Sequence, residues 1–235
     1  MMWSFITVAR GLWSVTERML NSLVATCEPG LGEIEIVYLD NGSPSPSSYE
    51  SFLQWQLKYP KIPARGFKID HDVSLGSAWN FGIGRRRAEM VAGENYIVLV
   101  NNDVTFLQAG WQQALFDALS REGVGVTGLN GMSWNIFNFI QGSFLAFKES
   151  TLDVVGPFDE SFEFTCEDVD WCYRANTHGY TLATLESLNG VCIMHHDGTT
   201  RHAYGEEFKR HLDLLAAISR LRLCHKWNLP LTCGD

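Results

Sequence analysis

The sequence predicts an α/β protein in which helices cover both faces of a parallel sheet, within a single domain. Three observations support this fold class. Short apolar runs alternate with amphipathic helical segments through the first half of the chain. The run 96–103 is almost continuously apolar, as expected for a strand buried on both faces. No linker-like change of composition divides the 235 residues.

The elements of the first half follow from turn residues and apolar spacing. A β-rich run opens the chain, and the helix after it ends near Pro29 and Gly30. The second strand stops at Asn41-Gly42-Ser43-Pro44, a typical turn sequence. The expected strands are 4–10, 33–40, 66–70 and 96–103. The expected helices are 16–27, 48–60, 74–90 and 110–122.

The second half is less regular. We expect a helix at 167–179, with Gly179 as its C-cap, and a long basic amphipathic helix at 206–227. The expected strands are 123–128, 139–148, 180–186 and 190–196. The final helix is expected to pack on its own domain or on a second copy in a homodimer. Peripheral contact with an anionic membrane surface is the alternative.

Composition narrows the class of function. The chain has 18 Lys and Arg against 27 Asp and Glu, a formal charge of −9, which argues against nucleic acid as a partner. Its six cysteines form no CxxC pair, so we expect free, mostly buried thiols. No signal-peptide pattern or apolar run of membrane-spanning length is present. The expected location is cytoplasmic, with the inner membrane face as an alternative.

Two acidic residues follow apolar strands. Asp40 ends one strand and Asp103 ends another, where an unpartnered buried charge would be costly. Each alone is best explained as a cap of the next turn, but two at matching strand ends favour a ligand site. No glycine-rich phosphate loop is present. A bound nucleotide diphosphate would therefore need a metal bridge, and Asp103 offers the oxygen ligand that Mg²⁺ or Mn²⁺ prefers.

A second group of polar residues lies later in the chain. Glu167, Asp168 and Asp170 occupy the first turn of a predicted helix, where carboxylates complement the helix dipole. That explanation is kept for Asp170. Glu167 and Asp168 lie among aromatic residues, and burial could raise a pKa there to suit a general base. His195 and His196 end an apolar strand and are candidate metal or phosphate contacts.

Seven segments in order resemble one enzyme family. They are SFITVAR, EIVYLDNGS, SLGSAWNFGI, YIVLVNND, IQGSFLAFK, VGPFDESFEFTCEDVDWCYR and IMHHDGTT. This order resembles the glycosyltransferases of family 2, which have a GT-A fold, and in particular their rhamnosyltransferase-like branch. The match runs from about residue 4 to 200. It implies a three-layer Rossmann-like fold with a mixed, mostly parallel central sheet.

The resemblance implies a role for individual residues. Asp168 matches the catalytic base, with Glu167 beside it, and Trp171 and Trp134 would face sugars of the acceptor. Asp103 of the Asn-Asn-Asp segment would hold the metal together with His195 or, alternatively, His196. The residues implied in nucleotide-sugar binding are Thr7, Ala9, Asp40, Asn41, Gly76, Asn80, Asn101, Asn102, Gln141 and Gly142. The segment 8–11 departs from the family pattern, Val-Ala-Arg-Gly replacing Pro-Thr-Tyr-Asn.

The implied function is an inverting, Mn²⁺- or Mg²⁺-dependent hexosyltransferase of polysaccharide biosynthesis. It would move a sugar from a UDP- or dTDP-linked donor to a glycan or lipid-linked acceptor. Residues 1–105 would be the nucleotide-binding half, 106–205 the acceptor and catalytic half, and 206–235 the terminal helix and tail. The alternatives are a sugar-phosphate nucleotidyltransferase and a non-catalytic carbohydrate-binding protein. A nucleotidyltransferase would be expected to have a basic, glycine-rich loop after its first strand. This chain has only Arg10 and Gly11 there, which argues against that alternative.

Overall fold

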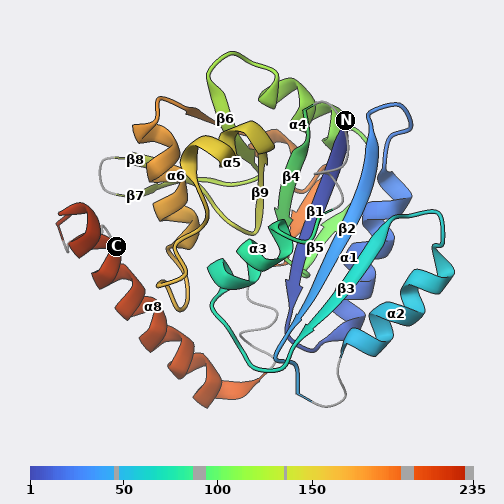
Figure 1. Cartoon of the computed structure of the whole chain (residues 1–235), viewed down its shortest axis with the longest axis horizontal. Coiled ribbons are helices and arrows are strands. Elements are labelled where there is room, and N and C mark those ends of the chain that lie inside the picture. The colour runs from blue at the N-terminus through green and yellow to red at the C-terminus, as the bar shows by residue number, and fades with distance from the viewer. Residues whose placement is uncertain (45–47, 87–93, 135–136, 197–203, 231–235) are drawn as a thin grey trace.

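The computed structural model describes residues 1–44, 48–86, 94–134, 137–196 and 204–230. A seven-stranded sheet forms the centre of the molecule (Figure 1). Its strands, in spatial order, are β10 (Thr181–Thr184), β6 (Val124–Gly128), β9 (Phe144–Lys148), β4 (Tyr96–Val100), β1 (Met2–Ala9), β2 (Glu33–Asn41) and β3 (Ala64–Ile69). Only β9 runs antiparallel to its neighbours, β4 and β6. The predicted α/β class with a mixed, mostly parallel sheet is confirmed.

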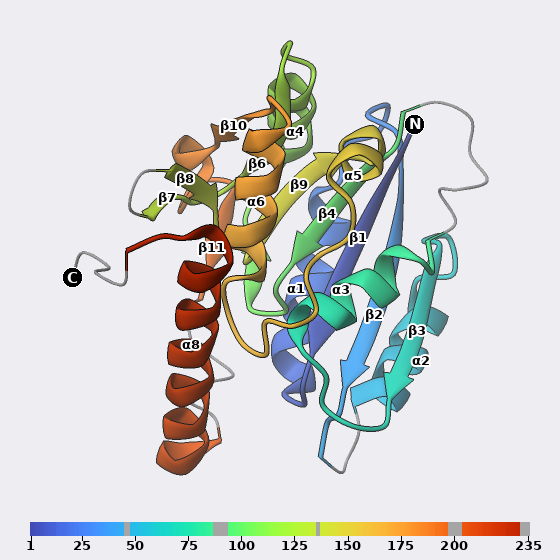
Figure 2. The ribbon, with the colours of Figure 1, turned by 60° about the vertical axis from the view of Figure 1, so that its left-hand side comes forward.

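Helices cover both faces of this sheet (Figure 2). One face packs against α1 (Trp13–Thr26), α2 (Ser48–Lys58) and α4 (Trp111–Leu119). The other packs against α3 (Leu75–Ile83), α5 (Glu149–Val155) and α6 (Glu167–Thr177). The central strand β1 serves both layers because its side chains alternate: Phe5 enters the first core and Ile6 the second. Each layer therefore buries one set of strand side chains.

Three elements differ from the prediction, two of them in the second half. The expected strand 139–148 is broken at Gln141–Ser143 into β8 (Phe137–Ile140) and β9. The expected strand 190–196 is reduced to β11 (Ile193–His195), which pairs antiparallel with β5 (Val104–Phe106), and β8 pairs with β7 (Gly131–Trp134). The helix expected at 74–90 ends at Ile83, because Gly84 caps it, and residues 87–93 lie outside the described part.

The last helix, α8 (Gly205–Trp227), confirms the predicted terminal helix. It packs on its own domain through Ala216, Ser219 and Leu223, while Leu214 and Leu221 stay exposed. It runs from the edge of the sheet where β1 ends to α6 (Figures 1 and 2). No helix in the described residues is long and apolar enough to cross a membrane.

The prediction about cysteines is confirmed for the described part of the chain. The five described cysteines form no disulfide bond with one another, and four are buried: Cys166, Cys172, Cys192 and Cys224. Cys27 is partly buried, and burial raises the pKa of its thiol to about 12. Cys233 lies outside the described residues.

Candidate active site

The two acidic strand ends lie at one edge of the sheet. Strands β1, β2 and β4 are parallel, and their register places Ala9 beside Asp40. Asp103 follows β4 in the turn that leads to β5. Because the carboxyl ends of parallel strands meet at the same edge, this is where an open α/β sheet binds ligands.

Asp40 is fully buried, and its carboxylate is bound within the chain. One oxygen accepts a hydrogen bond from the Ser43 N–H at 3.1 Å. The other accepts from the Tyr49 N–H at 3.0 Å and from the Ser48 hydroxyl at 3.3 Å. Asp40 therefore organises the turn and the start of α2, which is the capping role that the sequence left open. The role of Asp40 in nucleotide-sugar binding stays a prediction.

The segment that departs from the family pattern contacts α8. Arg10 forms an ion pair with Asp72 and lies over the Phe208 ring, 5.2 Å from its centroid. The Tyr204 hydroxyl donates to the Arg10 carbonyl at 2.8 Å. Asn41, at the end of the next strand, donates to Asp72 at 3.1 Å. This edge of the sheet, beside the end of β1, carries the residues that the resemblance implies in nucleotide-sugar binding. It thus also includes side chains from the terminal helix.

At the same edge of the sheet, Thr7 and Ala9 of β1 are both buried. The hydroxyl of Thr7 is fully buried and has no hydrogen-bond partner within the described residues. A buried polar group without a partner is uncommon, and a bound ligand would satisfy it.

The turn after β4 points its three residues in different directions. The Asn101 N–H donates to the Ser143 carbonyl at 2.9 Å. The side-chain amide of Asn102 donates to the Thr16 hydroxyl of α1 at 3.1 Å, so this side chain is turned into the fold. Asp103 points instead toward β11.

Asp103 and His195 form the candidate metal centre. The His195 Nε2 lies 3.2 Å from the Asp103 Oδ1, and both side chains are largely buried. Antiparallel pairing of β11 with β5 sets this contact, because it places His195 opposite Val104. His196 points elsewhere, and its Nε2 lies 3.1 Å from the Thr105 hydroxyl. The structure therefore separates two histidines that the sequence motif leaves equivalent.

These residues fit a divalent cation. The Asp103 Oδ1 is fully buried and accepts no hydrogen bond within the described residues, although the His195 Nε2 lies 3.2 Å away, so a bound cation would give this oxygen a partner. Oxygen and imidazole nitrogen are both suitable donors to Mn²⁺. No group of three or more His, Cys, Asp or Glu side chains that could hold a metal occurs in the described ranges. A bound diphosphate would have to supply the other oxygens.

Asp168 lies in a second polar cluster at the start of α6. Its Oδ2 accepts a hydrogen bond from the Gly142 N–H at 2.7 Å, and its Oδ1 accepts from the Val169 N–H at 2.8 Å. A side chain at Gly142 would meet Trp79 at 2.6 Å and the Asp168 Oδ2 at 3.3 Å. Glycine is therefore required for the backbone to approach this carboxylate so closely.

The two clusters are joined through one turn. Residues 141–143 interrupt the expected strand, so that Gly142 binds Asp168 while Ser143 binds Asn101 of the turn that carries Asp103. Gln141 fixes the turn from outside by accepting from the Asn130 amide at 3.1 Å. The structure thus brings Asp103 and Asp168 to opposite sides of a single turn.

Glu167 is buried beside Asp168 and has an unusual local backbone. Its Oε2 has no hydrogen-bond partner in the described structure. Thr165 and Cys166, immediately before it, both have positive φ angles, 63° and 72°, which are strained for residues with a Cβ. This left-handed pair turns the chain sharply so that α6 begins with both carboxylates inside the molecule. Such strain is typical of functional sites and leaves no sequence signal.

Burial changes the acid–base behaviour of this pair. Desolvation raises the pKa of Glu167, and the charge of Asp168 raises it further. Desolvation also raises the pKa of Asp168, against the hydrogen bonds from Gly142 and Val169. A carboxylate with a raised pKa is a better proton acceptor near neutral pH than an ordinary one.

Gly76 and Asn80, two of the residues implied in nucleotide-sugar binding, connect α3 to a neighbouring loop. Asn80 donates to the Phe158 carbonyl and accepts from the Phe158 N–H, both at 2.9 Å. A Cβ at Gly76 would lie 3.2 Å from the Asp159 carbonyl and 3.6 Å from Glu167. These contacts align α3 with α6, and a nucleotide contact for either residue stays a prediction.

The expectation that Trp171 faces a sugar is wrong. Its side chain is completely buried, its indole N–H donates to the Gly156 carbonyl at 2.8 Å, and its ring stacks on Phe158. An indole enclosed on all sides cannot stack on an acceptor. Trp134 is partly buried at the end of β7, beside residues 135–136, which lie outside the described part. Its acceptor contact stays a prediction.

Replacing Glu167 by glutamine is expected to stabilise the protein at pH 8. A carboxyl group whose pKa is raised by folding binds more protons in the folded protein than in the unfolded one. Its contribution to the free energy of unfolding is therefore present in acid and is lost as the pH rises. E167Q removes that loss. We expect a gain of at least about 1 kcal/mol in the free energy of unfolding at pH 8, the equivalent of one pKa unit, and almost none at pH 4.

Urea denaturation of both proteins at pH 4, 6 and 8 measures this difference. The exposed Glu122 provides the matched control, because E122Q removes the same charge outside the site. A difference in stability between E167Q and the wild type that does not change with pH would contradict the claim that burial raises the pKa of Glu167.

Comparison with known proteins bears on the fold of the chain. No protein-family profile matches the chain. The rhamnosyltransferase WbbL of Escherichia coli (strain K12) is 29% identical over 77 residues, which are 33% of this chain and 28% of that protein. The match thus spans less than a third of the relative's length.

Solved structures give a broader match. A mannosyltransferase of Pyrobaculum calidifontis, in complex with GDP-Man and Mn²⁺, superimposes with a TM-score of 0.68 and 16% identity, covering 97% of this chain and 72% of that one. Residues 1–349 of TarS from S. aureus, in complex with UDP-GlcNAc, superimpose with a TM-score of 0.61 and 15% identity, covering 95% and 67%. The chain therefore has the GT-A fold, and it resembles the glycosyltransferases of family 2.

Proposed function

We propose that the protein transfers a sugar from a nucleotide-sugar donor to an acceptor hydroxyl, with inversion at the anomeric carbon. One observation carries this proposal: a buried carboxylate suited to accept a proton, Asp168, and a buried Asp103–His195 pair are connected through the turn 141–143 at the carboxyl edge of the sheet. A sugar transfer needs both a base for the nucleophile and a site for the leaving diphosphate. The neighbouring solved structures hold nucleotide-sugars and, in one case, Mn²⁺.

Asp168 would act as the general base. Its carboxylate accepts the acceptor's hydroxyl proton while that oxygen attacks the anomeric carbon and the bond to the diphosphate breaks. The Gly142 N–H fixes the orientation of the carboxylate. Its raised pKa favours proton transfer near neutral pH, which is typically worth about 10²–10⁴-fold in rate.

Asp103 and His195 would hold a divalent cation, Mn²⁺ or Mg²⁺. When bound there, the cation would neutralise negative charge on the leaving diphosphate. This role explains how a chain with a net charge of −9 can accept an anionic donor. The protein's own contribution is to keep the Asp103 carboxylate buried next to the imidazole, with an Oδ1 that accepts no hydrogen bond from the described residues.

A panel of nucleotide-sugars tests the proposed function. UDP-linked hexoses and dTDP-rhamnose are incubated with the protein and Mn²⁺ or Mg²⁺, and release of the nucleoside diphosphate is measured. We expect release from one donor, faster with an acceptor glycan and abolished by EDTA. Release of pyrophosphate from a nucleoside triphosphate and a sugar phosphate would instead indicate a nucleotidyltransferase. No release from any donor would favour a carbohydrate-binding protein.

A further inference from the structure

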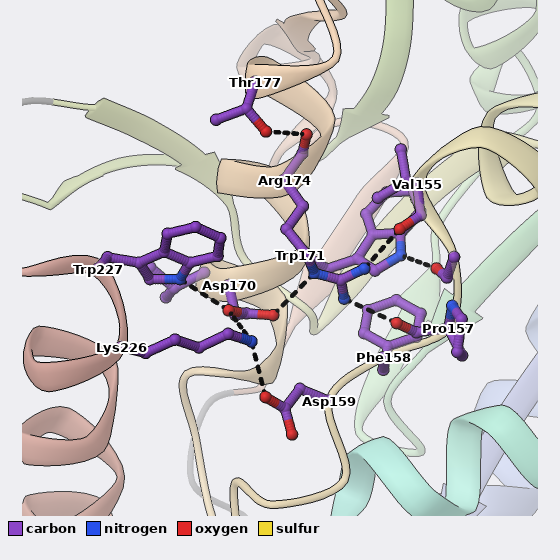
Figure 3. A network of polar contacts seen from close by, with 12 residues as sticks. Val155, Pro157, Phe158, Asp159, Asp170, Trp171, Arg174, Thr177, Lys226 and Trp227 are labelled. Carbon is purple, nitrogen blue, oxygen red and sulfur yellow. Dashed lines mark hydrogen bonds and ion pairs between the residues drawn. The ribbon is translucent and has the colours of Figure 1, made fainter.

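An ion-pair network centred on the buried Asp170 connects the terminal helix α8 to the helix that begins with the proposed base. Figure 3 shows Lys226 and Trp227 of α8 pointing at Asp170 of α6, with Asp159 and Arg174 on either side. Asp170 lies two residues after Asp168 on the same helix. The sequence offered only a helix-dipole role for it, because two of its three partners, Lys226 and Trp227, are distant in the chain.

Asp170 is fully buried, and its carboxylate has three partners. One oxygen accepts a hydrogen bond from the Arg174 Nε at 2.9 Å. The other accepts a hydrogen bond from the Trp227 indole N–H at 2.8 Å and forms an ion pair with the Lys226 Nζ at 2.7 Å. A carboxylate removed from water in this way needs such donors, since an uncompensated buried charge is strongly unfavourable. Two of the three donors come from α8.

Lys226 also binds the loop between α5 and α6. Its Nζ lies 2.7 Å from the Asp159 Oδ2 as well. Burial pushes the pKa of Asp159 upward, but hydrogen bonds from Lys226 and Ser161 prevail and lower it to about 2. The ammonium group thus bridges two carboxylates on different elements.

The same loop contacts the far side of the candidate site. Phe158 and Glu160 bind Asn80 of α3, and the Asp159 carbonyl lies against Gly76. Arg174 donates to the Val155 and Pro157 carbonyls at 2.6 and 2.7 Å, which fixes the start of the loop on α6. A shift of α6 relative to this loop would therefore move Asp168 relative to the turn at Gly142.

We propose that Lys226 is a positioning residue for the transfer reaction. By bridging Asp170 and Asp159 it fixes the first turn of α6, and with it the Asp168 carboxylate, against the loop and α3. Only the last turn of α8, which carries Lys226 and Trp227, has this role. The inference rests on the proposed function, in which Asp168 is the base.

The variant K226M tests the role of the charge, since methionine keeps the apolar stem. We expect kcat for sugar transfer to fall at least tenfold, while KM for the donor changes less than twofold. The reason for this split is that, within the described structure, Lys226 touches none of the residues assigned to donor or metal binding. K226R, which keeps the charge, should retain kcat within threefold of the wild type.

K209M is the matched control, because Lys209 lies on the same helix and outside this network. It should leave both constants unchanged. Hydrogen–deuterium exchange gives a readout that does not depend on activity. Peptides covering 167–177 should exchange at least threefold faster in K226M than in the wild type, and at the wild-type rate in K209M.

Two results would overturn the proposal: a folded K226M with kcat within twofold of the wild type, or an equal loss of kcat in K226M and K209M. If K226M does not fold, as judged by circular dichroism, W227F carries the test. It removes only the indole donor to Asp170, and it should lower kcat about threefold; unchanged kcat there also refutes the idea. A wild-type protein that releases no nucleoside diphosphate refutes the proposed function itself, whereas an active wild type with an equally active K226M refutes only the role of Lys226.

Discussion

D168N is expected to lower the rate of sugar transfer about 10²–10⁴-fold, the usual contribution of a general base. Asparagine has nearly the same shape and can still accept the Gly142 hydrogen bond, so the turn 141–143 should remain in place. It cannot take up the acceptor proton. Donor affinity should stay within about threefold of the wild type, because the residues assigned to the donor and the metal are unchanged.

The pH dependence gives a second, independent sign of the same base. Because desolvation raises the pKa of Asp168, transfer by the wild type should decline on acidification at a higher pH than an ordinary aspartate would give. That acidic limb should be absent from the residual activity of D168N. Initial rates between pH 4.5 and 8.5, together with calorimetry for the donor, measure both effects.

D153N is the matched control for this variant. Asp153 is exposed on α5, so the same chemical change there should leave transfer and its pH profile intact. A D168N protein with wild-type turnover would exclude Asp168 as the base. The buried Glu167 would then be the remaining carboxylate of the pair to test.

D103A is expected to remove the metal dependence of nucleotide binding. The wild type should bind the nucleoside diphosphate of its donor, UDP or dTDP, at least tenfold more tightly with Mn²⁺ than with EDTA. Without the Asp103 carboxylate the cation loses its anionic protein ligand, and the affinities with Mn²⁺ and with EDTA should converge. Isothermal calorimetry with UDP and dTDP, with and without Mn²⁺, measures this difference.

The adjacent histidines provide a matched pair for the same measurement. His195 lies 3.2 Å from Asp103, whereas His196 contacts Thr105. H195A should therefore reduce the effect of Mn²⁺, and H196A should leave it near the wild-type value. A Mn²⁺ effect that survives in both D103A and H195A would place the cation elsewhere in the protein.

Local patterns predicted most of the central sheet, because an apolar run followed by an amphipathic segment has one stable solution in a parallel sheet. They also placed Asp40 and Asp103 close to the carboxyl ends of two strands, although β4 ends at Val100, before the predicted residue 103. The predicted break points were less accurate. The turn at Gln141–Ser143 has apolar neighbours on both sides, so nothing in the pattern separates β8 from β9.

The residues of the candidate site show where local reasoning ends. Trp171 has the type of side chain that stacks on sugar rings. Its position on α6, however, places the indole in the core between Phe147 and Phe158. Asp170 has the appearance of a simple helix-dipole residue, yet it is the buried centre of an ion-pair network. In both cases the deciding factor is which face of α6 meets the sheet, and this depends on every element that packs there.

The sequence by itself determined the fold class, the order of elements and the residue types available for chemistry, since these depend on neighbours in the chain. Only the tertiary structure decided which of two adjacent histidines meets Asp103, because strand pairing fixes the direction of each side chain. It alone placed Gly142 against Asp168 and Lys226 against Asp170, contacts that span 26 and 56 residues of sequence. Burial follows from such distant packing, and burial is what raises the pKa values of the two carboxylates at the start of α6.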